Sequence, residues 1–102
     1  MKLNDVRSFL LKLKQKDIIF DPHFYTRLRD RPINEGIVRS FLSQIDKLEK
    51  IEIGKIEGRF KLWFKMSRKY SLVLIIEIKS SKDLKVISAW NTEKTWQDKL
   101  KQ

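Results

Sequence analysis

"RFKLWFKMSRKYSLVLIIEIK", residues 59–79, holds two consecutive stretches that decide how the chain folds. In the first, residues 59–66, apolar side chains alternate with cations and a tryptophan. Because successive side chains of a strand point to opposite faces, this alternation predicts a strand with a core face and a basic outer face. The core face carries Phe60, Leu62, Phe64 and Met66, and the outer face carries Arg59, Lys61, Trp63 and Lys65. Residues 71–79 are nearly continuously apolar, which is typical of a central strand covered on both faces.

The N-terminal half shows the period of helices. An apolar stripe along residues 4–16 predicts a helix capped by Asn4, and the apolar run at residues 17–20 predicts a short strand. A second helix is predicted to start at Asp21, a capping side chain followed by a proline at the first helical position. This helix ends by Arg31, because the next residue is a proline that disfavours a helical residue before it.

Asn34 predicts the cap of a third helix, whose apolar residues recur with the spacing of a core-facing stripe. Residues 48–58 and 84–91 predict two more strands, and residues 92–100 a short closing helix. The order is helix, short strand, two helices, four strands, helix. Helices segregated from a meander predict an α+β fold, with N-terminal helices packed on a four- to five-stranded, mainly antiparallel sheet. Residues 1–102 form one domain, in which residues 1–16 are an N-terminal helical extension.

The charge balance points to a polyanionic partner. The chain has 102 residues and a formal net charge of +10, from 23 basic and 13 acidic residues. Such an excess favours nucleic acid, the ribosome or an anionic membrane. The basic, amphipathic first helix is compatible with a membrane surface, but we expect it to pack on the sheet or cover the site, and we expect no membrane partner.

Cysteine is absent and there is one histidine, so disulfides and thiolate metal sites are excluded and no metal or cofactor is expected. The first residues do not resemble a secretion signal, and we expect a cytoplasmic protein.

The element order, together with "IIFDPHFYTRLRDRPINEGIVRSFLSQ" (residues 18–44), resembles the RelE/ParE-like toxin superfamily. The resemblance is closest to small, poorly characterised members with a His-x3-Arg-x3-Arg helix followed by an "I…V…L" helix, and it covers roughly residues 17–98. It implies RNA cleavage without a metal, often on the ribosome, and neutralisation by a small antitoxin protein. ParE-type members act on gyrase instead, so the fold alone does not define the target.

In the RNA-cleaving branch, functional arginine, lysine and tyrosine residues lie on the concave face of the sheet. The resemblance places them here at Arg59, Lys61 and Lys65. The C-terminal tyrosine of well-studied members has no clear match, because Trp90, Asn91 and Trp96 occupy that region.

Three basic side chains recur along the predicted second helix: His23, Arg27 and Arg31. His23 and Arg27 are four residues apart and share a helix face, and Arg31 lies a further turn along. An imidazole beside two guanidiniums is suited to grip a phosphate, and the guanidiniums would favour the neutral histidine that a general base requires. The alternative is a solvent-facing His23 paired with Asp21 or Asp30.

The outer face of residues 59–65 is suited to phosphate chemistry. Cleavage without a metal requires attack of the 2′-hydroxyl on phosphorus, and fixed cations such as Arg59 and Lys61 stabilise the charge that builds on the phosphoryl oxygens. Lys65 adds a further charge, and Trp63 offers a ring on which an unpaired base can stack. The alternative is an edge strand protected from aggregation by its charges, with Trp63 covered by the first helix.

Neighbouring residues complete the candidate site. Arg68, Lys69 and Tyr70 follow in a predicted turn, where Tyr70 is a candidate proton donor or stacking ring and a plain basic turn is the alternative. Glu77 interrupts the central apolar strand. It is expected to form a structural ion pair with Arg59 or Lys61, or to act as a base.

The sequence thus predicts a RelE-like toxin-type protein that binds RNA and is a candidate metal-independent endoribonuclease. The catalytic candidates are Arg59, Lys61, His23, Arg27 and Glu77. The nucleic-acid-binding candidates are Trp63, Lys65, Arg68, Lys69, Tyr70 and Arg31. Expected partners are RNA or the ribosome and a small acidic antitoxin. The alternatives are a non-catalytic nucleic-acid- or ribosome-binding module and a toxin that acts on a protein; the oligomeric state stays open.

Overall fold

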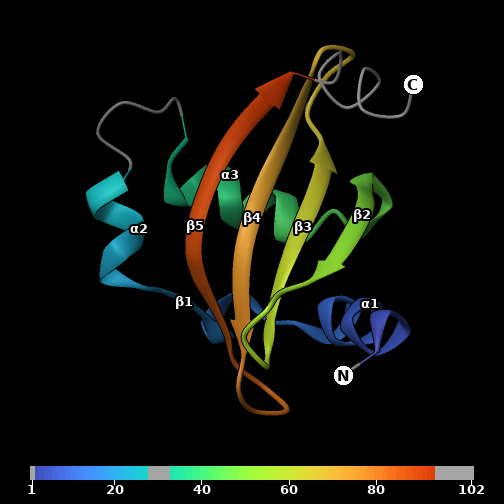
Figure 1. The fold of residues 1–102 in the computed structure, drawn as a ribbon, viewed down its shortest axis with the longest axis vertical. Coiled ribbons are helices and arrows are strands. Elements are labelled where there is room, and N and C mark those ends of the chain that lie inside the picture. Colours follow the sequence, from blue (N-terminus) through green and yellow to red (C-terminus); the bar gives the residue numbers. More distant parts are fainter. Residues whose placement is uncertain (1, 28–32, 94–102) are drawn as a thin grey trace.

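A computed structural model describes residues 2–27 and 33–93 of the chain, and Figure 1 shows their α+β fold. A five-stranded sheet is accompanied by three α-helices and two short 3-10 helices. The elements are α1 (Leu3–Lys12), η1 (Gln15–Asp17), β1 (Ile18–Phe20), α2 (Pro22–Arg27), α3 (Glu35–Leu42), η3 (Ile45–Lys47), β2 (Leu48–Ile53), β3 (Arg59–Lys65), β4 (Tyr70–Ile78) and β5 (Leu84–Glu93). The predicted end of the second helix lies outside the described residues, as do residues 94–100 of the predicted C-terminal helix. The first two residues of that predicted helix, Thr92 and Glu93, instead belong to β5.

The strands are arranged in the order β1-β5-β4-β3-β2. The last four form the predicted antiparallel meander, and β4 lies between β3 and β5 as a central strand. The sheet is nevertheless mixed, because β1 pairs in parallel with β5. The chain therefore crosses the whole sheet between β1 and β2, and α2 and α3 lie on this connection.

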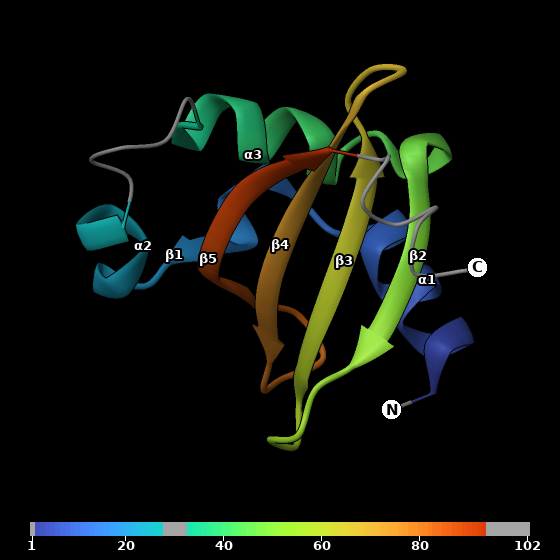
Figure 2. The same ribbon diagram turned by 45° about the horizontal axis from the view of Figure 1, so that its top comes forward.

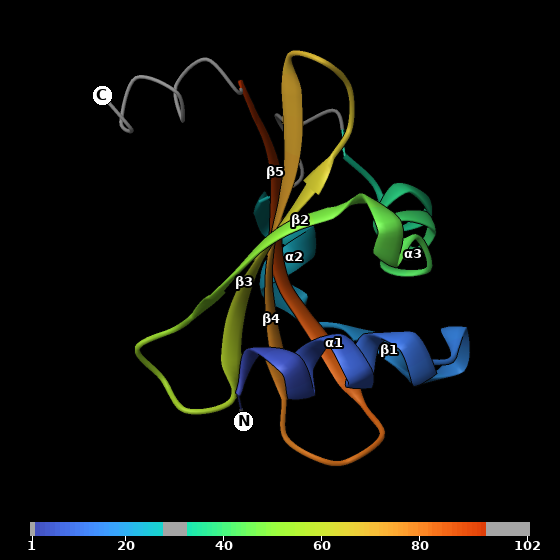
Figure 3. The same cartoon turned by 90° about the vertical axis from the view of Figure 1, so that its right-hand side faces the viewer.

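The core lies between the sheet and two helices. In Figure 3, which views the sheet close to edge-on, α1 and α3 lie on the same side of it. Val6 of α1 and Val38 of α3 are fully buried there, in the same core cluster as Phe64 of β3. Helix α2 instead lies beside β5 at the β1 edge (Figure 2). It is anchored by Phe24, whose ring centroid is 4.7 Å from that of Phe20.

The first helix differs from the prediction at both ends. It begins at Leu3, so Asn4 lies inside it, and the Asp5 carboxylate accepts a hydrogen bond from the Lys2 N–H at 3.0 Å. It ends at Lys12 rather than at residue 16. Gln15 is held by α3 instead: its carbonyl accepts from Arg39 Nη1 at 2.8 Å, and its amide donates to the Arg39 carbonyl at 3.1 Å. This tertiary contact turns the chain into β1, which the helical pattern of residues 4–16 did not show.

The predicted cap of the third helix is confirmed, because Asn34 Oδ1 accepts a hydrogen bond from the Ile37 N–H at 2.9 Å. We expect Asn34→Ala to lower the free energy of unfolding by about 1 kcal/mol, since a first-turn N–H loses its acceptor. Denaturant unfolding measures this change. Asn34→Asp keeps the acceptor and is the control, so an equal loss in both variants would contradict the capping role.

Within the described residues, no helix is both long and apolar enough to cross a membrane.

Candidate functional site

The sheet face opposite α1 and α3 carries the outward-pointing residues of the meander. Their register forms four rows across the strands. The rows are Lys65–Ser71–Thr92, Lys50–Trp63–Val73–Trp90, Glu52–Lys61–Ile75–Ser88 and Arg59–Glu77–Lys85. We call these residues the basic face, because lysine and arginine outnumber the glutamates among them. The predicted outer face of residues 59–65 is the β3 part of this surface.

Lys61 lies against two tryptophans at the centre of the basic face. Its Nζ atom is 4.8 Å from the ring centroid of Trp63 and 5.5 Å from that of Trp90. Lys50 Nζ lies 5.8 Å from the Trp63 centroid. Attraction between an ammonium group and the face of an indole ring holds the Lys61 charge at a defined position. This placement depends on Trp90 of β5, a residue that was not predicted to belong to the site.

Trp63 and Val73 form a small apolar patch beneath these lysines. Trp63 is 6% exposed and Val73 is fully buried, yet neither belongs to the core cluster on the helix side. The first helix therefore does not cover Trp63, since α1 packs on the other face. Nor is β3 an edge strand, because β2 and β4 flank it. Trp63 offers a base little ring surface, whereas Trp90 is only half-buried.

Arg59 and Glu77 form an ion pair across neighbouring strands. Arg59 Nε donates to Glu77 Oε2 at 2.9 Å, and Lys79 Nζ lies 3.3 Å from Glu77 Oε1. The Arg59 hydrogen bond lowers the pKa of Glu77 below its ordinary value; burial opposes this and Lys79 reinforces it. A carboxylate with a lowered pKa is a weak base, so the geometry supports a structural ion pair rather than proton transfer for Glu77.

The Glu77 pKa makes stability depend on pH. Because the folded-state pKa of Glu77 lies below 4.5, its ionised carboxylate stabilises the protein at pH values above 4.5. This contribution is lost as the pH falls through the folded-state pKa. We therefore expect the free energy of unfolding to fall on acidification below about pH 4.5, and to fall less in Glu77→Gln. Urea unfolding at several pH values measures this. Glu52→Gln, which removes a partly exposed carboxylate, is the control. Parallel pH curves for wild type and Glu77→Gln would contradict the assignment.

Helix α2, which carries His23, lies at the β1 edge of the sheet. His23 is exposed on α2, beside β5, and strands β5 and β4 separate this helix from β3. The Asp21 carboxylate accepts from the His23 backbone N–H at 2.8 Å and lies 3.7 Å from Lys85 Nζ. The structure therefore does not bring His23 together with Arg59. The Arg27 side chain and Arg31 lie outside the described residues.

The turn between β3 and β4 presents the remaining candidates to solvent. Arg68, Lys69 and Tyr70 are exposed, as is Lys65 at the end of β3. The Ser67 hydroxyl accepts hydrogen bonds from the N–H groups of Lys69 at 3.2 Å and Tyr70 at 3.1 Å, and this stabilises a turn without glycine. The turn extends the positive charge of the basic face beyond the end of the sheet.

No protein-family model, curated protein or solved structure matches the chain. Among the described residues, no three histidine or acidic side chains are grouped as a metal ion would require.

Proposed function

We propose that the protein binds single-stranded RNA through the basic face. The observation that carries the proposal is the position of Lys61 against Trp63 and Trp90, with Lys50 in the same cluster. Cations held on a rigid sheet beside aromatic rings are the usual means of binding a single strand, in which the backbone is charged and the bases are unpaired. Trp90, being half-buried, is the ring best placed for a base.

The spacing on β3 supports a backbone ligand. Arg59 and Lys61 occupy consecutive positions on one face, about 6.6 Å apart, and Lys65 lies about 13 Å beyond Lys61 on the same face. Successive phosphates of an extended strand are separated by a similar distance. The basic turn residues Arg68 and Lys69 lie beyond Lys65, and they would prolong the contact.

Kinship with RelE-like toxins is part of the same proposal. The described order of one helix, a short strand, two helices and four strands is consistent with the resemblance seen in the sequence. A small acidic antitoxin would complement the +10 charge and compete with RNA for the basic face.

Metal-independent cleavage is the second candidate function, favoured by the Arg59–Glu77 ion pair. The pair holds the guanidinium on the strand that carries Lys61. In such a reaction the 2′-hydroxyl attacks phosphorus, the 5′-oxygen leaves, and Arg59 and Lys61 stabilise the charged phosphoryl oxygens. Glu77 is a weak base there and His23 lies on a distant element, so binding has better support than cleavage.

The test is to incubate the protein with single-stranded RNA and with translating ribosomes in EDTA, and to compare wild type with Arg59→Ala/Lys61→Ala. We expect salt-sensitive binding that the double variant loses. Cleavage lost in the same variant would establish the ribonuclease. Absence of binding in wild type would overturn the proposal, and nuclease-insensitive capture of one protein would favour a protein target.

A further inference from the structure

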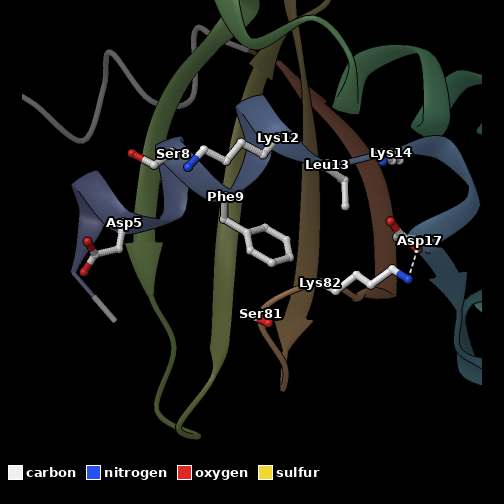
Figure 4. A pocket seen from close by; sticks show the side chains of 9 residues that line it. All are labelled: Asp5, Ser8, Phe9, Lys12, Leu13, Lys14, Asp17, Ser81 and Lys82. Atoms are coloured by element: carbon white, nitrogen blue, oxygen red, sulfur yellow. Dashed lines mark ion pairs between the residues drawn. The ribbon is translucent and has the colours of Figure 1, made fainter.

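A second candidate binding site, a cavity, lies away from the basic face. A cavity of about 440 Å³ opens between α1, the segment after it and the turn that joins β4 to β5 (Figure 4). Sites for small organic molecules occupy about 300–1,000 Å³, so the cavity is large enough for such a ligand. Its lining comes from parts of the chain that are far apart in sequence, which a fixed fold holds in place.

Asp17 is the poorly compensated charge of this cavity. Its side chain is 10% exposed, and its nearest cation is Lys82, whose Nζ lies 3.9 Å from Asp17 Oδ1. This separation is too long for a hydrogen bond, and the Lys82 side chain is 64% exposed. Among the described residues, nothing donates a hydrogen bond to the Asp17 carboxylate. The carboxylate oxygens keep limited contact with water, and a ligand that donates charge-assisted hydrogen bonds to them would replace this limited hydration and the distant lysine.

The wall formed by α1 and the residue after it has two apolar side chains among polar ones. The Phe9 ring projects into the cavity, and Leu13 lies between that ring and Asp17 (Figure 4). Both side chains are half-buried and pack against the core, so their positions are fixed by the fold. The cavity thus places two apolar side chains near a carboxylate, and Asp5, Lys12 and Lys14 also line it.

We propose that this cavity binds a small aromatic cation that carries an amine or amidine group. The cationic group would donate hydrogen bonds to Asp17, two parallel ones in the case of a planar amidinium. Its ring would pack against Phe9. Lys82 would be displaced into solvent, which is feasible because its side chain is mostly exposed. This site is independent of RNA binding and uses no residue of the basic face.

The test is a titration of ¹⁵N-labelled protein with benzamidine, followed by NMR. Benzamide, which has the same shape without the charge, is the control ligand. We expect benzamidine to shift the amides of Phe9, Asp17 and Ser81 saturably, and benzamide to bind at least about tenfold more weakly. Asp17→Asn should weaken benzamidine about tenfold, whereas Lys82→Gln should strengthen it, because the lysine no longer competes for the carboxylate.

Two outcomes would overturn the proposal: equal binding of both ligands, or Lys82→Gln binding benzamidine no better than wild type. Lys82→Gln changes an exposed residue, so it decides the matter even if Asp17→Asn fails to fold. Asp46→Asn on η3 is the matched control, because it removes an exposed carboxylate outside the cavity and should leave binding unchanged. RNA affinity of Lys82→Gln should equal that of wild type.

Discussion

Replacing Lys61 and Lys65 together with glutamine should weaken binding of single-stranded RNA about 100-fold at low salt. Lys61 is held between two indole rings at the centre of the basic face, and Lys65 ends the same strand. Each phosphate contact that is lost also lowers the slope of log affinity against log salt by about one. Fluorescence anisotropy with a labelled pyrimidine-rich RNA, at several salt concentrations, measures both quantities.

The matched control is Lys12→Gln/Lys14→Gln. Both lysines are exposed and lie on the helix side of the sheet, and the double change lowers the net charge by the same amount. If non-specific attraction by the overall charge were responsible for binding, the two double variants would lose equal affinity. Binding through the basic face requires Lys61→Gln/Lys65→Gln to lose far more RNA affinity than the control. Thermal unfolding shows whether both variants are folded.

Arg59→Ala should be the most destabilising change among the cations of the basic face, because it leaves Glu77 buried without its hydrogen-bonding partner. Removing one partner of a fully buried ion pair costs about 3–5 kcal/mol. Arg59 is 36% exposed and Lys79 still contacts the carboxylate, so solvent screening reduces the expected loss to about 2 kcal/mol. Urea unfolding at neutral pH gives this value.

Two variants distinguish the effect of losing the ion pair from the effect of losing any positive charge. Arg59→Leu/Glu77→Leu removes both members and should recover most of the stability that Arg59→Ala loses. Lys50→Ala breaks the exposed pair with Glu52 and the contact with the Trp63 ring, and it should lower the free energy of unfolding by less than about 1 kcal/mol. A loss in Lys50→Ala as large as in Arg59→Ala would contradict the structural role. Loss of RNA binding by Arg59→Ala is therefore interpretable only at temperatures where the variant is folded.

The local patterns predicted most of the fold. The alternation at residues 59–65 and the apolar run at residues 71–79 become β3 and β4, with the faces that the sequence indicated. The Asn34 cap was also predictable, because it depends on a side chain three residues from its partner. These features depend on residues that are close together in the sequence, so local patterns are sufficient to predict them.

Long-range contacts were not predictable in the same way. The parallel pairing of β1 with β5 joins residues 66 positions apart, as in Ile18 and Leu84, and a three-residue strand carries no signal of its partner. That pairing places α2 at the far edge, and this separates His23 from Arg59. Likewise, Trp90 reaches Lys61 only because β5 lies beside β4 in the observed register. Simple alternation from the core residues Leu84 and Val86 would place Trp90 on the core face; the register shift between the Val86–Ile76 and Ser88–Ile75 pairs turns it to the basic face, and the sequence carries no signal for that shift.

The central claim is that the basic face, and not the helix side, binds RNA. NMR titration of ¹⁵N-labelled wild-type protein with a short single-stranded RNA tests it most directly. We expect amide shifts and line broadening to concentrate on β3, β4 and β5 around Lys61 and Trp90, with the Trp90 indole signal strongly perturbed. Perturbations concentrated on α1 and α3, or none at a saturating RNA concentration, would contradict it.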